Sequence, residues 1–182
     1  MNLRLTQFFW VLTLCLTEIV GGSAPLSCEI RSALDGVDLV ARFRVDDQGG
    51  LLRRHVSVTR KGRRVDATVL IAPVTIRASL AGLAGRFMLN LTATPAFNIG
   101  DGMQMDLTLV EGEERRPVYS RYFDAGRMAE DREWIPIEVP LALSGSRDVY
   151  LEIKVSGGPQ GDMVADWLAF AEAVIVRAKD PQ

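Results

Sequence analysis

Aromatic and acidic residues gather in three segments that are rich in turn formers. These segments span residues 94–102, 124–133 and 156–167. Loops at one end of a β-fold often meet at a single rim and carry binding residues there. Aromatic faces can stack on the rings of a ligand, while carboxylates and amides can hydrogen-bond its polar groups. The ligand-binding residues predicted on this basis are Trp134, Trp167, Phe97, Asn98, Asp101, Asp131, Asp162 and Asp166.

Each of these residues also has a structural interpretation. Trp134 opens a strand and Trp167 follows a glycine-rich loop, and at such positions a bulky side chain often plugs the end of a sandwich. For both tryptophans this packing role is favoured over an exposed platform. The carboxylates would by default cap turns. They could instead bind calcium, which prefers oxygen ligands, although no loop of the D-x-D-x-D-G type is present.

A basic segment provides a second candidate site, for anions. Clustered guanidinium groups suit phosphate or sulfate on a surface glycan or a lipid headgroup. The favoured alternative is a solvated edge hairpin whose charges prevent pairing with another chain. Nucleic acid is not expected, because no aromatic residues are interleaved. The predicted anion-binding residues are Arg53, Arg54, Arg60, Arg63 and Arg64, with Lys61 and His55 among them.

Motifs for catalysis are missing. The sequence holds no G-x-S-x-G, no H-E-x-x-H, no phosphate-binding G-x-x-x-x-G-K-[ST] and no G-x-G-x-x-G. The single histidine lies in the basic segment and is a poor base for a serine triad. Glycoside hydrolysis needs only two carboxylates, but no pair stands out. We therefore predict no catalytic residues, and no cofactor beyond the calcium alternative.

The first 24 residues resemble an export signal. Arg4 precedes an apolar run over residues 5–16, and small residues follow at 21–24. Cleavage would fall between residues 22 and 24, and an uncleaved membrane anchor is the alternative. Removal of the signal would take Cys15 with it and leave Cys28 as one thiol without an internal disulfide. A periplasmic or extracellular location is expected, with residues 25–182 as one domain.

Alternating apolar and polar residues predict an all-β fold. In residues 149–155, Val149, Leu151, Ile153 and Val155 share one face, which indicates a half-buried antiparallel strand. Phe43 and Val45 are expected to point inward in the same way. Turn signals at short intervals favour an antiparallel β-sandwich, with one helical turn near Met128. The predicted strands span 40–45, 55–60, 65–71, 74–80, 86–93, 103–110, 117–123, 134–143, 149–155 and 170–176.

Residues 74–176 resemble the galactose-binding-like jelly-roll family, which includes many carbohydrate-binding modules, and they are close to uncharacterised bacterial exported domains of that shape. Three pieces carry the resemblance: residues 100–102 before a strand, Asp131 with Trp134 at the start of another, and the glycines of 157–161 before Asp166 and Trp167. The resemblance implies a jelly roll that binds sugars, lipids or protein surfaces. The resemblance also implies a structural calcium, which family members often carry, but it does not identify the ligands in this sequence.

The combined prediction is a non-enzymatic exported module that binds carbohydrate or a cell-envelope glycan. The net charge of −2 provides no general attraction for nucleic acid or an anionic membrane. Membrane contact is expected only through an uncleaved signal segment. A structural or protein-interaction domain without a small ligand is the first alternative, and a glycoside hydrolase is the second.

Overall fold

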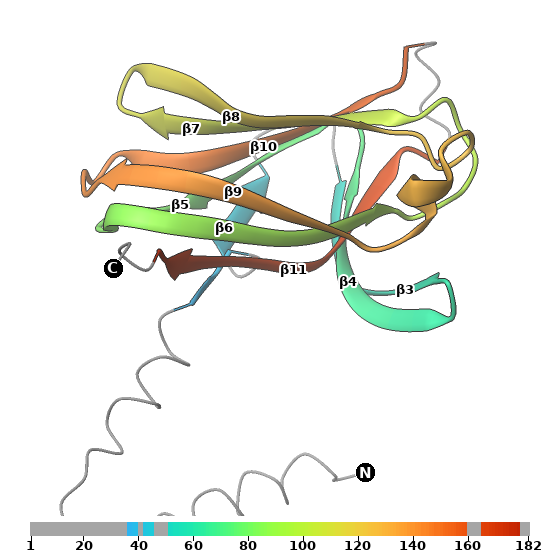
Figure 1. Cartoon of the computed structure of the whole chain (residues 1–182). Helices are drawn as coiled ribbons and strands as arrows, with labels where there is room; N and C mark the ends of the chain where they lie inside the picture. The colour runs from blue at the N-terminus through green and yellow to red at the C-terminus, as the bar shows by residue number, and fades with distance from the viewer. Residues whose placement is uncertain (1–35, 40–41, 46–50, 160–164, 179–182) are drawn as a thin grey trace, which may run out of the picture. The chain divides into compact units, whose positions relative to one another are not determined.

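The computed structural model describes residues 36–39, 42–45, 51–159 and 165–178 (Figure 1). All of them belong to the compact unit Asp35–Gln182. The predicted export signal, Cys15, Cys28 and Asp162 lie outside the described residues. Within the described part of the chain, no helix has the length and apolar character needed to span a membrane.

Two antiparallel sheets form the layers of a β-sandwich (Figure 1). We name each sheet after its central strand. The β11 sheet has the order β3 (Leu51–Arg60), β4 (Arg63–Ile71), β11 (Trp167–Arg177), β6 (Ala84–Pro95) and β9 (Ile135–Ser144), with β1 (Val37–Asp38) also on β11. The β10 sheet has the order β2 (Phe43–Val45), β5 (Val74–Ser79), β10 (Val149–Gly157), β7 (Met103–Glu111) and β8 (Glu114–Phe123).

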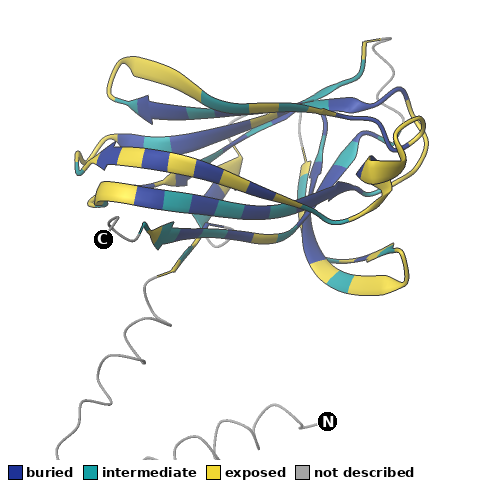
Figure 2. Cartoon of the chain, in the orientation of Figure 1, coloured by how far each residue is buried: buried dark blue, intermediate teal, exposed yellow. Residues whose placement is uncertain are grey.

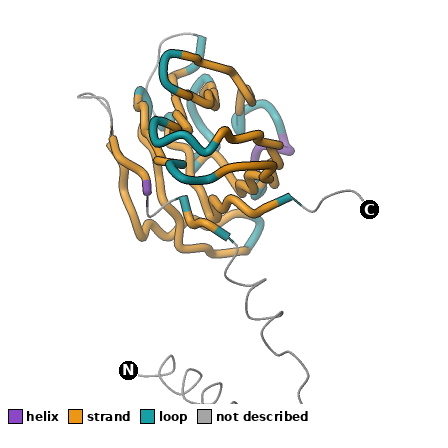
Figure 3. The backbone as a smooth tube through the Cα atoms, turned by 90° about the vertical axis from the view of Figure 1, so that its left-hand side faces the viewer, coloured by secondary structure: helices purple, strands orange, loops and turns teal. Residues whose placement is uncertain are grey.

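The strand order is that of a jelly roll. From β4 to β11 the chain alternates between the layers except at the hairpin of β7 and β8, and the sheet orders are β4-β11-β6-β9 and β5-β10-β7-β8. This is the interleaved arrangement of two Greek keys. The strands before β4 are additions at the margins: β3 extends the β11 sheet, and β2 extends the β10 sheet. Figure 3, turned by 90°, shows strands on both sides of the molecule. The predicted helical turn near Met128 is present as the segment η2 (Ala129–Arg132).

The core consists of the inward side chains of both layers. Val149, Leu151, Ile153 and Val155 are buried on one face of β10, as their alternation predicts. Figure 2 shows the same alternation of buried and exposed residues along β6 and β9. In the β11 sheet, Phe170 is fully buried and contacts Phe43 edge-on, with ring centroids 6.5 Å apart. Burial of alternate apolar side chains between two sheets is what holds the layers together.

Two details differ from the expectations. Val45 lies opposite the buried Ile76, yet it is 43% exposed because β2 is the short edge strand of its sheet. The basic hairpin is also tighter than predicted, since its turn consists of Lys61 and Gly62 with φ values of 43° and 78°. Two successive residues with positive φ are typical of a tight hairpin turn that matches the twist of its strands.

Candidate functional site

The three predicted loops meet at one end of the sandwich, on the right in Figure 1. The amide of Ala96 donates to the carbonyl oxygen of Trp167 at 2.6 Å, which joins the first loop to the third. Gly158 packs closely against Asp101, because a Cβ atom added to Gly158 would lie 2.5 Å from Oδ1 of Asp101. A Cβ on Gly126 would lie 3.5 Å from the carbonyl oxygen of Gly100. The segments therefore form one continuous surface, called here the loop rim: residues 96–101, 124–133, 156–159 and 165–167.

Two predicted aromatic residues are in contact at the loop rim. The rings of Phe97 and Trp167 meet edge-on, with centroids 5.1 Å apart and an interplanar angle of 72°. Phe97 is 40% exposed, whereas Trp167 is half-buried at the start of β11. The guanidinium of Arg53 lies 5.7 Å from the centre of the Trp167 ring. Trp167 therefore packs against the ring of Phe97. The rest of the Phe97 ring is exposed to solvent next to the exposed Asn98.

Trp134, like Trp167, packs on the outer face of the β11 sheet against a second apolar cluster, which consists of Val58, Ala67, Val69 and Ala169. The hairpin of β3 and β4 supplies three of these four residues. The indole N–H is buried and makes no hydrogen bond to any residue that the structure describes. This placement corresponds to the packing role, not to the exposed platform.

The predicted carboxylates lie beneath the surface of the loop rim. Asp101, Asp131 and Asp166 are only 6%, 2% and 1% exposed. Asp131 Oδ1 pairs with Arg121 at 2.7 Å, and its Oδ2 accepts the amide N–H of Asp124 at 2.6 Å. Asp124, which sequence reasoning did not single out, is also buried and accepts the amide N–H of Arg127 at 3.0 Å. Asp124 and Asp131 therefore hold the second loop in shape.

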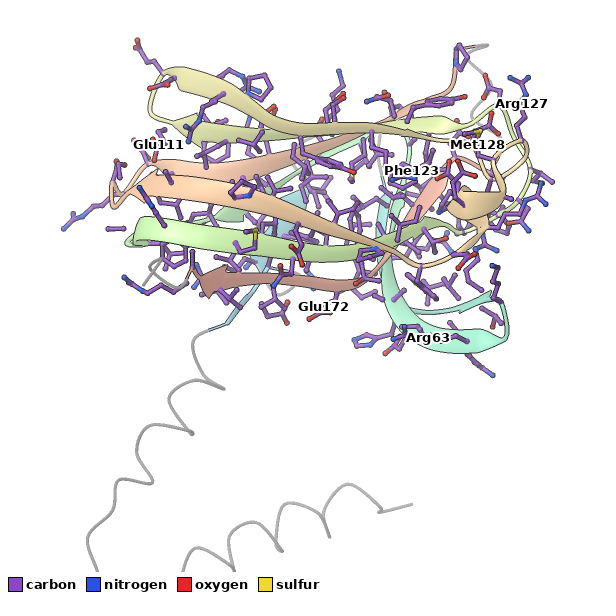
Figure 4. All side chains as sticks on the ribbon, in the orientation of Figure 1. Arg63, Glu111, Phe123, Arg127, Met128 and Glu172 are labelled. Carbon is purple, nitrogen blue, oxygen red and sulfur yellow. The ribbon has the colours of Figure 1, made fainter. Side chains whose placement is uncertain are left out.

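The outer surface of the loop rim includes apolar residues that sequence reasoning missed. Ile99 is 65% exposed and Met128 is 46% exposed. Figure 4 shows Met128 and Arg127 together at this end of the molecule. Tyr122, at the end of β8, is 40% exposed and donates its hydroxyl hydrogen to the carbonyl oxygen of Asp101. A signal was present, because Ile99 and Met128 are large apolar residues inside turn-rich segments.

The predicted anion-binding arginines do not converge on one point. Arg60 Nε donates to the carbonyl oxygen of Pro95 at 2.9 Å, and Arg64 donates to Ser57 on the opposite face of the hairpin. Arg54 donates to the carbonyl oxygen of Phe43 at 3.4 Å. Arg53 lies over Trp167, and Arg63 projects from the exposed hairpin (Figure 4). Anion binding by these five residues stays a prediction, without a shared pocket to support it.

A calcium site has no obvious ligand set. Within the described residues, no three His, Cys, Asp or Glu side chains are grouped so that they could hold a metal ion. Asp131 and Asp124 already accept hydrogen bonds or ion pairs within the second loop. Calcium binding therefore stays a prediction, for which the described side chains provide no ligand set.

A second recessed surface lies on the outer face of the β10 sheet. Polar residues of β5, β10, β7 and β8 line a shallow groove of about 830 Å³. Glu152 lies within it, only 8% exposed, and pairs with Arg77 of the neighbouring β5 and with Arg115 of β8, which lies beyond β7. The alternation of β10 placed Glu152 and Lys154 on this face, but sequence reasoning assigned them no role.

The sequence matches no protein-family model and no curated protein. Solved structures do match. Carbohydrate-binding module CBM51 from Clostridium perfringens GH95, in complex with methyl-galactose, is 14% identical with a TM-score of 0.53, covering 78% of this chain and 99% of that one. The CBM22-1 xylan-binding domain from Paenibacillus barcinonensis Xyn10C is 9% identical with a TM-score of 0.51, covering 75% of this chain and 87% of that one.

A third similar structure is part of a larger enzyme. It is BtGH115A, a 4-O-methyl-α-glucuronidase with specificity for decorated arabinogalactans, with a TM-score of 0.51 and 14% identity over 87% of this chain and 19% of that one. Identities this low establish the fold only. The predicted resemblance to a galactose-binding-like jelly roll of the carbohydrate-binding-module type is confirmed at that level.

Proposed function

We propose that the protein is a non-enzymatic exported module that binds carbohydrate at the loop rim. The observation that carries this proposal is the exposed ring of Phe97, supported edge-on by Trp167 and adjacent to the amide of Asn98. The C–H groups of a sugar ring pack on an aromatic face, and an amide can both donate to and accept from the hydroxyl groups. The fold shared with carbohydrate-binding modules adds support of a general kind.

Such a site would be shallow and would require no cofactor. The buried Asp124 and Asp131 would position the second loop, while Phe97 and Asn98 would touch the sugar. Export through the N-terminal signal would bring the module to glycans of the cell envelope or beyond. N-terminal sequencing of the protein recovered outside the cytoplasm tests that part, with a start at residue 23, 24 or 25 as the expected result.

The binding experiment compares the full chain with three variants at Phe97. Neutral polysaccharides containing galactose or xylose are titrated by calorimetry and by affinity electrophoresis. Phe97→Ala and Phe97→Leu are expected to weaken binding about tenfold, because both lose the planar ring that an aromatic contact requires. Phe97→Tyr keeps the ring and should retain binding. All three should melt within a few degrees of the parent, because Phe97 is 40% exposed.

Two results would overturn the proposal. Equal binding by the parent and Phe97→Ala would place the sugar elsewhere. Silence of the parent across both neutral and acidic glycans would favour the alternative of a protein-interaction module, for which the exposed Ile99 and Met128 would provide an apolar contact surface.

A further inference from the structure

The groove on the β10 sheet separates its charges by depth. Glu152 is the most buried of its charged groups, with a side chain that is 10% exposed, and the half-buried Asp106 accepts hydrogen bonds from Gln104 at 3.0 Å and Ser120 at 2.7 Å. Its basic groups are outermost. The side chains of Arg77 and Arg115 are 39% and 51% exposed, and Lys154 is exposed as well.

The register of the strands produces this arrangement. Glu152 lies directly opposite Arg77 of β5, and Lys154 lies opposite both Thr75 of β5 and Asp106 of β7. Arg115 reaches the same carboxylate from β8. Cross-strand neighbours on one face have adjacent side chains, so the charges are carried by rigid backbone and not by loops. Three cations and two carboxylates leave the groove with a local excess of one positive charge.

Glu152 holds both arginines in place, and the two outermost cations, Arg115 and Lys154, keep hydrogen-bond donors for a ligand. Glu152 fixes Arg77 at 3.2 Å, and the Arg77 guanidinium also lies 4.7 Å from the centre of the Tyr150 ring. Glu152 pairs with Arg115, and this hydrogen bond raises the pKa of the Arg115 guanidinium. A guanidinium carries five N–H donors in a planar fork, more than one carboxylate oxygen can accept. Lys154 forms no ion pair with any residue that the structure describes.

We propose that this groove binds the anionic groups of an acidic polysaccharide, with Arg115 and Lys154 as the contacting cations and Glu152 as the residue that positions both arginines. The anionic group is a carboxylate or a sulfate, because both accept paired hydrogen bonds from a guanidinium. Thr75 and Thr108 also line the groove and provide hydroxyl groups that can hydrogen-bond to sugar hydroxyls. The proposal rests on the proposed carbohydrate-binding function and adds a second surface and a charge class to it.

General attraction does not explain such binding. The chain has a net charge of −2 and would repel a polyanion at long range. The interaction therefore depends on the local cations, and salt should weaken it. The basic hairpin is the natural comparison, because its arginines are numerous and three of them, Arg54, Arg60 and Arg64, already donate to backbone or side-chain acceptors.

The experiment uses two double variants of the full chain that change the net charge by the same amount. Arg115→Gln with Lys154→Gln alters the groove, and Arg63→Gln with Arg64→Gln alters the hairpin. Affinity electrophoresis is run in polygalacturonate, which carries carboxylates, in dextran sulfate, and in neutral dextran. The parent should be retarded by at least one of the two polyanions and not by dextran. The groove variant should lose about tenfold in affinity and the hairpin variant less than about twofold.

The two polyanions distinguish carboxylate from sulfate, and retention by either supports the proposal. Failure of both to retard the parent overturns it, as does an equal loss in the two double variants. Thermal melting of each variant shows whether folding is intact; if the groove variant is unfolded, Lys154→Gln alone is tested, since Lys154 is exposed and unpaired within the described residues. Phe97→Ala separates the two sites, because it should lose the neutral glycan and keep the polyanion.

Discussion

Tyr122 connects β8 to the buried carboxylates of the loop rim. Its hydroxyl donates to the carbonyl oxygen of Asp101, and Gly102 approaches its ring. Burial raises the pKa of the Tyr122 phenol above its ordinary value of 10.0, and the nearby carboxylates of Asp124 and Asp101 raise it further. Ionisation would remove the donated hydrogen and place a negative charge beside two carboxylates, so the folded protein favours the neutral phenol.

This shift predicts a loss of stability at alkaline pH. Above pH 10 the unfolded chain releases the Tyr122 proton while the folded chain retains it, so the unfolding free energy falls as pH rises towards the folded pKa. Urea unfolding between about pH 8 and pH 11 measures this slope. Tyr122→Phe should lose about 0.5–1.5 kcal/mol at pH 8 with the hydrogen bond, and should show a shallower slope above pH 10. Identical slopes in both proteins would contradict the assignment.

We expect the hairpin of β3 and β4 to open locally more easily than any other element of the fold. β3 is an edge strand, and the half of the hairpin next to the turn contributes Val58 and Ala67 to the second apolar cluster, whereas Leu52 and Leu70 near its base pack in the main core. A bulge between Arg53 and Val56 interrupts its ladder, and His55 there has a positive φ of 59°. Lys61 at the turn pairs with the exposed Glu133, a contact that contributes little in solvent.

A charged side chain introduced into the second apolar cluster should therefore detach the hairpin from this cluster while the rest of the sandwich stays folded. Val58 is 6% exposed in the second cluster, so Val58→Asp would bury a carboxylate against apolar side chains. We expect amide hydrogen exchange in residues 56–66 to accelerate about 100-fold, while β10 stays protected. Thr59→Asp is the matched control, because Thr59 is the exposed neighbour on the opposite face. Equal acceleration in β10 would show that the hairpin is not separable.

Alternation along each strand was sufficient to predict the layers. It identified the inward faces of β6, β7 and β10, and turn residues marked where these strands end. Alternation does not say which strands become neighbours, so the pairing of β11 with β4 and β6 was not predictable. The two-residue β1 was missed for a related reason, because so short a strand has no period to detect.

Contacts between side chains were harder to predict from the sequence than the face of the strand on which each side chain lies. The three loops of the rim were identified from composition, yet the burial of Asp101, Asp131 and Asp166 depends on how the loops pack. The Glu152 carboxylate joins residues from three strands, and Arg77 is 75 positions away from it in the sequence. Such a network follows from strand order and register, neither of which a local pattern contains. The groove was therefore visible only in the structure.

At the scale of the whole molecule, β11 is the strand that closes the fold. It pairs with β6 on one side and with β4 and β1 on the other, so it connects the beginning and the middle of the chain (Figure 1). Its inward residues Leu168, Phe170, Ala173 and Ile175 are all buried in the core. It also begins with Trp167 at the loop rim, which means that the fold and the proposed sugar site share the same strand.

The cooperativity of the sandwich should therefore depend on this last strand. Removing Leu168, Phe170 and Ile175 from the core would cost about 7–15 kcal/mol, judged from typical large-to-small substitutions, and a domain of this kind has a total stability of about 5–15 kcal/mol. A chain that ends after Asp166 should consequently show no cooperative thermal transition by circular dichroism and should be digested rapidly by protease. A chain that ends after Ala178 keeps all of β11 and should melt like the full protein. A sharp melting transition in the shorter chain would mean that the β10 sheet, together with β6 and β9, can form a folded unit without its central partner.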